Sequence, residues 1–144
     1  MKTLIIEDEY PAAERLEKLI HKVDTDIKIV AVLGSIEAAG KWLASNPPPD
    51  LIFSDIQLSD GLSFQIFEQF SVKTPIIFTT SYDEYAVKAF KVKSIDYLLK
   101  PIKLQELEAA LAKFREMQKA FSPTDYALKV ESLLDNLQLT GPRK

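Results

Sequence analysis

The chain has 144 residues, of which 47% are apolar and 27% charged, so length and composition fit one globular domain. Its formal net charge of −3 makes it a poor candidate for binding nucleic acid by charge alone. The absence of cysteine excludes disulfides, thiolate zinc sites and thiol catalysis, and the single histidine excludes a multi-histidine metal site. The N-terminal segment has no signal-peptide pattern, and no apolar run approaches the roughly 20 residues of a membrane span, so we expect a cytoplasmic protein.

Strand and helix patterns alternate along the first half of the chain. Residues 3–6 predict a strand, and residues 12–22 predict a helix because apolar side chains recur there at helical spacing. Residues 27–33, rich in β-branched side chains, predict a second strand. Ser35 is the expected N-cap of the next helix, which must end before the prolines at residues 47–49 because proline cannot continue it.

The second half of the chain continues this alternation. The predicted strands are residues 51–54, 76–80 and 96–99, and the predicted helices are residues 62–70, 84–90 and 104–121. The strands are short and nearly all apolar, as expected when helices cover both faces of a sheet. Five βα units therefore predict an α/β fold with a parallel five-stranded sheet and helices on both faces.

The last part of the chain predicts an extra C-terminal helix. Residues 122–125 (SPTD) place a serine cap, a proline and an acid at a helix start, and apolar residues then recur on one face. We therefore expect a domain at residues 1–121 and an extension at residues 122–144. An isolated helix of that length is marginal in water, so its apolar face needs this domain or another chain. Residues 141–144 (GPRK) suggest the start of a linker in a longer protein.

Polar side chains follow four of the predicted strands at their C-terminal ends. Glu7 and Asp8 follow the first strand, Asp55 follows the third, Thr80 ends the fourth and Lys100 follows the fifth. Ligands bind beyond the carboxyl ends of strands in open parallel sheets, so we expect one shared site. Close carboxylates repel unless a cation compensates, and Mg²⁺ prefers carboxylate oxygens. Glu7, Asp8 and Asp55 therefore predict a magnesium site.

An aspartate beside bound Mg²⁺ can act as a nucleophile towards phosphorus and form an aspartyl-phosphate. Thr80 and Lys100 are placed to offer a hydroxyl and an ammonium to the phosphoryl oxygens, although each alone is an ordinary strand-end threonine or surface lysine. We interpret Glu9 and Asp60 as helix caps or solvated loop acids. The Lys100–Pro101 bond can be cis at low cost, but the base rate favours trans.

Four segments carry a specific combination of motifs: IIEDE at residues 5–9, LIFSD at 51–55, TTS at 79–81 and YLLKP at 97–101. In this order and at these spacings they resemble the receiver domain of two-component response regulators, across residues 1 to about 121. The resemblance implies a flavodoxin-like doubly wound fold with strand order 2-1-3-4-5. It also implies that Asp55 accepts a phosphoryl group from a sensor histidine kinase.

The resemblance assigns roles to further residues at the matching positions. It implies that four residues hold Mg²⁺: Glu7 (through water), Asp8, Asp55 and Gln57 (by its backbone carbonyl). It implies that Thr80 and Lys100 contact the phosphoryl group and that Tyr97 is an aromatic switch residue. Glu7 departs from the family pattern, which more often has aspartate there, and its extra methylene changes its reach while keeping its charge.

Residues 55–62 and 78–90 look like the LytTR subgroup of receivers, which precede a DNA-binding domain. The resemblance implies control of transcription through a C-terminal domain that these 144 residues lack, and a homodimer on phosphorylation. It implies no enzyme activity beyond self-phosphorylation and dephosphorylation. One alternative is an aspartyl-phosphate phosphohydrolase, although those enzymes usually carry two aspartates two residues apart after the first strand. The other is a degenerate receiver that only binds proteins, although all five site groups are present.

Overall fold

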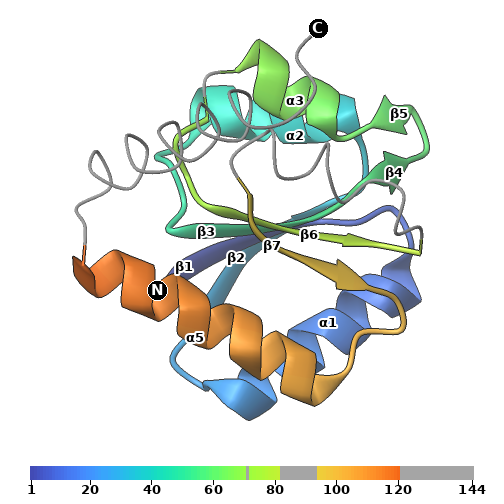
Figure 1. The fold of residues 1–144 in the computed structure, drawn as a ribbon. Helices are drawn as coiled ribbons and strands as arrows, with labels where there is room; N and C mark the ends of the chain where they lie inside the picture. The colour runs from blue at the N-terminus through green and yellow to red at the C-terminus, as the bar shows by residue number, and fades with distance from the viewer. Residues whose placement is uncertain (71, 82–93, 121–144) are drawn as a thin grey trace, which may run out of the picture.

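The computed structural model describes residues 1–70, 72–81 and 94–120, which form a parallel sheet with helices on both faces (Figure 1). The sheet has five strands in the order β2-β1-β3-β6-β7. Their bounds are β1 (Lys2–Ile6), β2 (Lys28–Leu33), β3 (Leu51–Asp55), β6 (Ile76–Thr80) and β7 (Ser94–Leu99). Since β4 and β5 lie in a separate hairpin, this order is the predicted 2-1-3-4-5 order of a doubly wound flavodoxin-like fold.

The helices within the described residues lie in two layers. Figure 1 shows α1 (Tyr10–Val23) and α5 (Leu104–Ala120) on one face of the sheet, and α2 (Ile36–Ser45) and α3 (Phe64–Gln69) on the other. The predicted cap of α2 is confirmed, because the Ser35 hydroxyl oxygen accepts a hydrogen bond of 3.0 Å from the Ala38 amide. The structure therefore has the layered α/β architecture that the alternating patterns predict.

Two of the predicted helices are not covered by the structure. The helix predicted at residues 84–90 and the C-terminal extension predicted at residues 122–144 lie outside the described residues. Within the described ranges, no helix combines the length and the apolar character that crossing a membrane requires.

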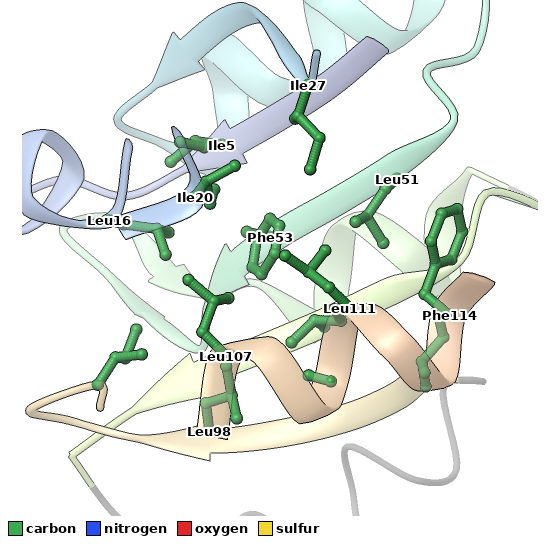
Figure 2. Packing of buried hydrophobic residues seen from close by; sticks show 14 of the residues in the cluster. Ile5, Leu16, Ile20, Ile27, Leu51, Phe53, Leu98, Leu107, Leu111 and Phe114 are labelled. Atoms are coloured by element: carbon green, nitrogen blue, oxygen red, sulfur yellow. The ribbon is translucent and has the colours of Figure 1, made fainter. Parts of the chain in front are cut away.

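Apolar side chains fill the interface between the sheet and each helical layer. β1 alternates between the two, with Ile5 in the cluster facing α1 and α5 and Leu4 and Ile6 in the cluster facing α2 and α3. Figure 2 shows the first cluster, which includes Leu16, Ile20, Leu51, Phe53, Leu98, Leu107, Leu111 and Phe114. β3 and β6 are buried along their whole length, so the strands that end at the site are held on both faces.

The segment after β3 differs from its predicted structure. Gln57–Leu58 (β4) and Gly61–Leu62 (β5) pair as a short antiparallel hairpin, so α3 begins at Phe64 and not at residue 62. The hairpin turn contains Asp60, and Gly61 has a φ of +138°, which is costly for any residue with a side chain. The sequence does not predict this hairpin, because strands of two residues are too short to show a period.

Candidate functional site

Three carboxylates meet at the carboxyl edge of the sheet. Glu7 and Asp8 directly follow β1 and Asp55 ends β3, and the two strands pair in parallel with Ile6 opposite Ser54. One carboxylate oxygen from each acid lies within 4.8 Å of the others. Glu7 and Asp55 are buried, each 6% exposed, whereas Asp8 is exposed to solvent. The structure thus brings together the three acids that the sequence predicts as one cluster.

Lys100 supplies a cation to this cluster. Its Nζ donates hydrogen bonds to Glu7 Oε1 at 2.6 Å and to Asp55 Oδ2 at 3.0 Å. Burial lowers the pKa of Lys100, but the hydrogen bonds and charges of Glu7 and Asp55 outweigh it and hold the pKa above its ordinary value. The lysine side chain is 20% exposed, so solvent screens these ion pairs weakly. The Lys100–Pro101 peptide is cis, so the trans isomer favoured by the base rate is wrong here.

Glu7 titrates far from its ordinary range. Burial raises the pKa of Glu7 from 4.5 to about 7, the hydrogen bond from Lys100 opposes that rise, and the nearby charge of Asp55 adds to it. The Glu7 carboxylate also accepts a hydrogen bond of 3.2 Å from the Glu9 amide. A buried acid with a raised pKa beside a second carboxylate favours a cation that can compensate both charges.

Thr80 ends the strand beside β3, and Gln57 begins the hairpin two residues after Asp55. Thr80 is the last residue of β6 and is buried, and its carbonyl accepts a hydrogen bond of 2.7 Å from the Lys100 amide. The Gln57 amide donates to Asp55 Oδ1 at 3.3 Å. The structure therefore places both residues at the edge of the sheet where the sequence predicts them.

Tyr97 lies on β7, three residues before Lys100, and pairs in register with Phe78 of β6. The tyrosine is half-buried and packs against the apolar cluster that faces α2 and α3. This position is that of an ordinary half-buried strand tyrosine, and it is equally compatible with a switch residue.

The acid cluster fits a hard divalent cation. Carboxylate oxygens are the ligands that Mg²⁺ prefers, and Mg²⁺ retains several of its waters when it binds to proteins. Glu7, Asp8 and Asp55 offer three such oxygens within 4.8 Å of one another, and the exposed Asp8 leaves one side open to water. These residues would hold the ion together with any backbone oxygen that the adjacent Gln57 supplies.

Two polar contacts near the site could not be predicted from the sequence. The Arg15 guanidinium on α1 donates a hydrogen bond of 3.0 Å to the carbonyl of Ile102, two residues after Lys100. The Asp60 carboxylate accepts hydrogen bonds from the first two amides of α2, Ile36 at 2.9 Å and Glu37 at 3.2 Å. Asp60 is therefore a helix cap, as expected for an isolated loop acid, but the helix that it caps lies more than 20 residues earlier in the chain.

Comparisons with known proteins identify relatives of this chain. The chain is 33% identical to the sensory transduction protein LytT of Bacillus cereus, over 90% of this chain and 53% of LytT. It is 39% identical to the transcriptional regulatory protein BtsR of Salmonella typhi, over 81% of this chain and 48% of BtsR. The chain thus spans about half the length of these curated relatives.

A solved structure has the same fold. The response regulatory domain of the protein mrkE from Klebsiella pneumoniae matches with a TM-score of 0.73 and 35% identity, over 84% of this chain and all of that domain. The family model of the response regulator receiver domain matches residues 3–112, which include every candidate site residue. The chain therefore belongs to the response regulator receiver domain family.

Proposed function

We propose that this receiver domain accepts a phosphoryl group on Asp55 from the phosphohistidine of a sensor histidine kinase, with Mg²⁺ bound beside it. The observation that carries the proposal is the convergence of Glu7, Asp8 and Asp55 with the Lys100 ammonium at one edge of the sheet. Paired acids and a cation at this position suit phosphoryl transfer, which depends on positioning and on neutralising charge.

In the transfer step, a carboxylate oxygen of Asp55 attacks phosphorus and forms a new P–O bond. The P–N bond of the donor phosphohistidine breaks, and the departing imidazole nitrogen keeps the electron pair. Mg²⁺, when bound, neutralises negative charge on the transferring group. Asp55 is held for this attack by the Gln57 amide on Oδ1 and by Lys100 on Oδ2.

Lys100 and Thr80 would bind the phosphoryl group once Asp55 is phosphorylated. A phosphoryl group adds roughly −1.5 to −2 charge at neutral pH and new acceptor oxygens. Lys100 already lies 3.0 Å from Asp55 Oδ2, so its ammonium can exchange a carboxylate for a phosphoryl oxygen with little movement. The hydroxyl of Thr80, at the end of the neighbouring strand, would bind another phosphoryl oxygen.

The output of phosphorylation would be a change in packing near β7. Movement of Thr80 towards the phosphoryl group would free space that the half-buried ring of Tyr97 can enter. The two packings are alternative states, and phosphorylation shifts the population between them. The resulting surface would promote a homodimer.

The signal would leave the domain through a C-terminal DNA-binding domain of the LytTR type, in a longer protein that regulates transcription. Two observations support this connection: the similarity to LytT and BtsR, and the fact that those proteins are about twice as long as the matched region. Residues 122–144 would form the extension that leads to that domain.

Intact mass spectrometry after incubation with acetyl phosphate tests the proposed function. The expected result is a gain of one phosphoryl group that requires Mg²⁺ and is lost at alkaline pH, as an acyl phosphate is. Catalytic turnover of phosphate monoesters would favour the phosphohydrolase alternative. A chain that binds a kinase but takes no label would favour a degenerate protein-binding receiver.

A further inference from the structure

The hairpin after Asp55 is tied to the start of a distant helix by one side chain. Asp60, in the turn between β4 and β5, accepts hydrogen bonds from the backbone amides of Ile36 and Glu37 in the first turn of α2. These contacts hold the pKa of Asp60 below its ordinary value, with the Ile36 amide as the largest cause. The carboxylate also lies at the positive end of the helix dipole.

The contact is supported by close packing around it. Gly61 follows Asp60 with a φ of +138°, and a Cβ added to it would lie 3.0 Å from Cδ1 of Ile36, so a side chain here would strain the backbone and require the end of the Ile36 side chain to shift. On the other strand of the hairpin, Leu58 is 7% exposed and belongs to the apolar cluster that Ile36 also contacts. The hairpin is thus fixed to α2 by packing as well as by hydrogen bonds.

The hairpin leads directly to the metal and phosphoryl site. Leu58 pairs with Gly61 and Gln57 pairs with Leu62, so the strand that contains Gln57 is tied to the strand that follows the Asp60 turn. The Gln57 amide in turn donates to Asp55 Oδ1. A displacement of the turn would therefore reach the residue that adjoins the phosphoacceptor.

The segment before α2 contacts the backbone of Glu7 and Asp8. Gly34 stands between β2 and the α2 cap, and a Cβ placed on it would lie 3.7 Å from Cα of Asp8. The backbone amide of Glu7 donates a hydrogen bond of 2.8 Å to the carbonyl of Leu33. The segment that leads into α2, at Leu33 and Gly34, therefore lies against the backbone of Glu7 and Asp8.

We propose that Asp60 is a positioning residue that holds the loop after Asp55, and with it Gln57, in place beside Glu7 and Asp8. The inference rests on the proposed function, because it assumes that these residues bind Mg²⁺ for phosphoryl transfer. Asp60 does not touch the acids, so it acts through the hairpin and the first turn of α2. The pairing of β1 with β3 sets the distance from Glu7 and Asp8 to Asp55, so loss of the Asp60 contacts would displace the loop that carries Gln57 and not Asp55 itself.

The chain contains a matched control for this inference. The Ser35 hydroxyl oxygen accepts a hydrogen bond of 3.0 Å from the Ala38 amide and so caps the same helix. Ser35 lies next to α2 in sequence and does not hold the hairpin. Asp60→Ala and Ser35→Ala each remove a cap from α2, and only the first releases the loop after Asp55. A purely structural role for Asp60 would make the two variants equivalent.

Titration calorimetry with MgCl₂ and thermal unfolding of the metal-free protein distinguish the two roles. We expect Asp60→Ala to weaken Mg²⁺ binding by about tenfold, as loss of a supporting residue around a metal site does. Ser35→Ala should keep Mg²⁺ affinity within about twofold of wild type while lowering the melting temperature. Asp60→Asn retains one acceptor oxygen and should recover part of the affinity. The same samples treated with acetyl phosphate report whether the wild-type domain is phosphorylated.

Each result has a defined consequence. Asp60→Ala is compared with Ser35→Ala, and Asp60→Asn replaces it if the alanine variant does not fold. If the Asp60 variant binds Mg²⁺ as tightly as Ser35→Ala, Asp60 is only a helix cap and the inference is wrong. In that case wild-type Mg²⁺ binding and labelling still stand, so the proposed function survives. If wild type itself neither binds Mg²⁺ nor takes a phosphoryl group, the proposed function fails and the inference fails with it.

Discussion

Lys100 Nζ lies 2.6 Å from Glu7 Oε1, so the lysine after the last strand of the sheet pairs with the glutamate after the first. The same ammonium lies 3.0 Å from Asp55 Oδ2. One cation therefore joins two buried carboxylates that belong to neighbouring strands. A bound Mg²⁺ ion would take over much of this compensation and leave Lys100 available to a phosphoryl group.

The raised pKa of Glu7 predicts that Mg²⁺ affinity depends on pH. Burial raises the pKa of Glu7 to about 7, and Mg²⁺ favours the ionised carboxylate, so binding displaces a proton below that pH. We expect affinity to increase with pH by up to about tenfold per unit and to level off above pH 7. Calorimetric titrations across this range in wild type and Glu7→Gln measure the effect. A slope that persists unchanged in Glu7→Gln would assign the proton to another group.

The raised pKa of Glu7 also predicts how the stability of the metal-free domain depends on pH. The pKa of Glu7 is about 7 in the folded state against 4.5 for a free glutamate, so between these values the folded state binds more protons than the unfolded state. The contribution of Glu7 to stability is therefore largest at low pH and is lost as pH rises from about 4.5 to 7. Glu7→Gln should remove this decline, which thermal unfolding without Mg²⁺ at several pH values would reveal.

Loss of the Lys100 ammonium should destabilise the metal-free domain. Lys100→Ala leaves two buried carboxylates without their cation, and we expect a loss of about 1–3 kcal/mol that Mg²⁺ largely restores. Thermal unfolding with and without Mg²⁺ tests this. The control is Lys18→Ala, which removes an exposed pair with Glu14 and should change stability by less than about 0.5 kcal/mol. Equal losses in the two variants would mean that the buried pairing is no stronger than a surface one.

Lys100→Ala should also separate phosphorylation from its structural consequence. Mg²⁺ binding should remain, because the lysine is not a metal ligand, but the phosphoryl group would lose its cationic partner. Hydrogen exchange before and after acetyl phosphate treatment should then change in wild type and stay constant in the variant. An exchange response in Lys100→Ala that equals the wild-type response would exclude Lys100 from the switch.

Gly61 should tolerate a side chain poorly, whereas Gly34 should tolerate one well. Gly61→Ala forces a φ of +138° on alanine and brings its Cβ to 3.0 Å from Ile36, so we expect a loss of about 1–3 kcal/mol. At Gly34 the nearest atoms lie at 3.7 and 3.8 Å and no positive φ is required, so alanine should change stability by less than about 1 kcal/mol. Chemical denaturation of both variants makes the comparison, and equal stabilities would show that the hairpin can move away from α2.

Much of the fold could be predicted from short local patterns. The apolar strand predicted at residues 51–54 and the serine cap at residue 35 are local features, and the structure confirms both, with the strand extending to Asp55. The order of the strands is implied by the family resemblance and not by any local pattern. The position of Glu7, Asp8 and Asp55 at one edge then follows from the parallel direction of β1 and β3.

The remaining features depend on contacts between distant residues. The strand pattern places Glu7 and Lys100 at one edge of the sheet, but it does not predict that their side chains pair, because residues 93 positions apart meet only after the sheet forms. Asp60 likewise caps a helix that starts 24 residues before it, so a search for nearby capping partners cannot find the pair. The β4–β5 hairpin is too short to show an alternating pattern, and the cis isomer at Pro101 opposes the base rate.

The central claim is that Asp55 is the phosphoacceptor. Intact mass spectrometry of wild type and Asp55→Asn after acetyl phosphate treatment tests it most directly, since asparagine keeps the shape of the side chain and removes the nucleophilic carboxylate. The account predicts one added phosphoryl group on wild type with Mg²⁺, none after chelation of the metal, and none on Asp55→Asn under any condition. Undiminished labelling of Asp55→Asn, stable in acid, would contradict it.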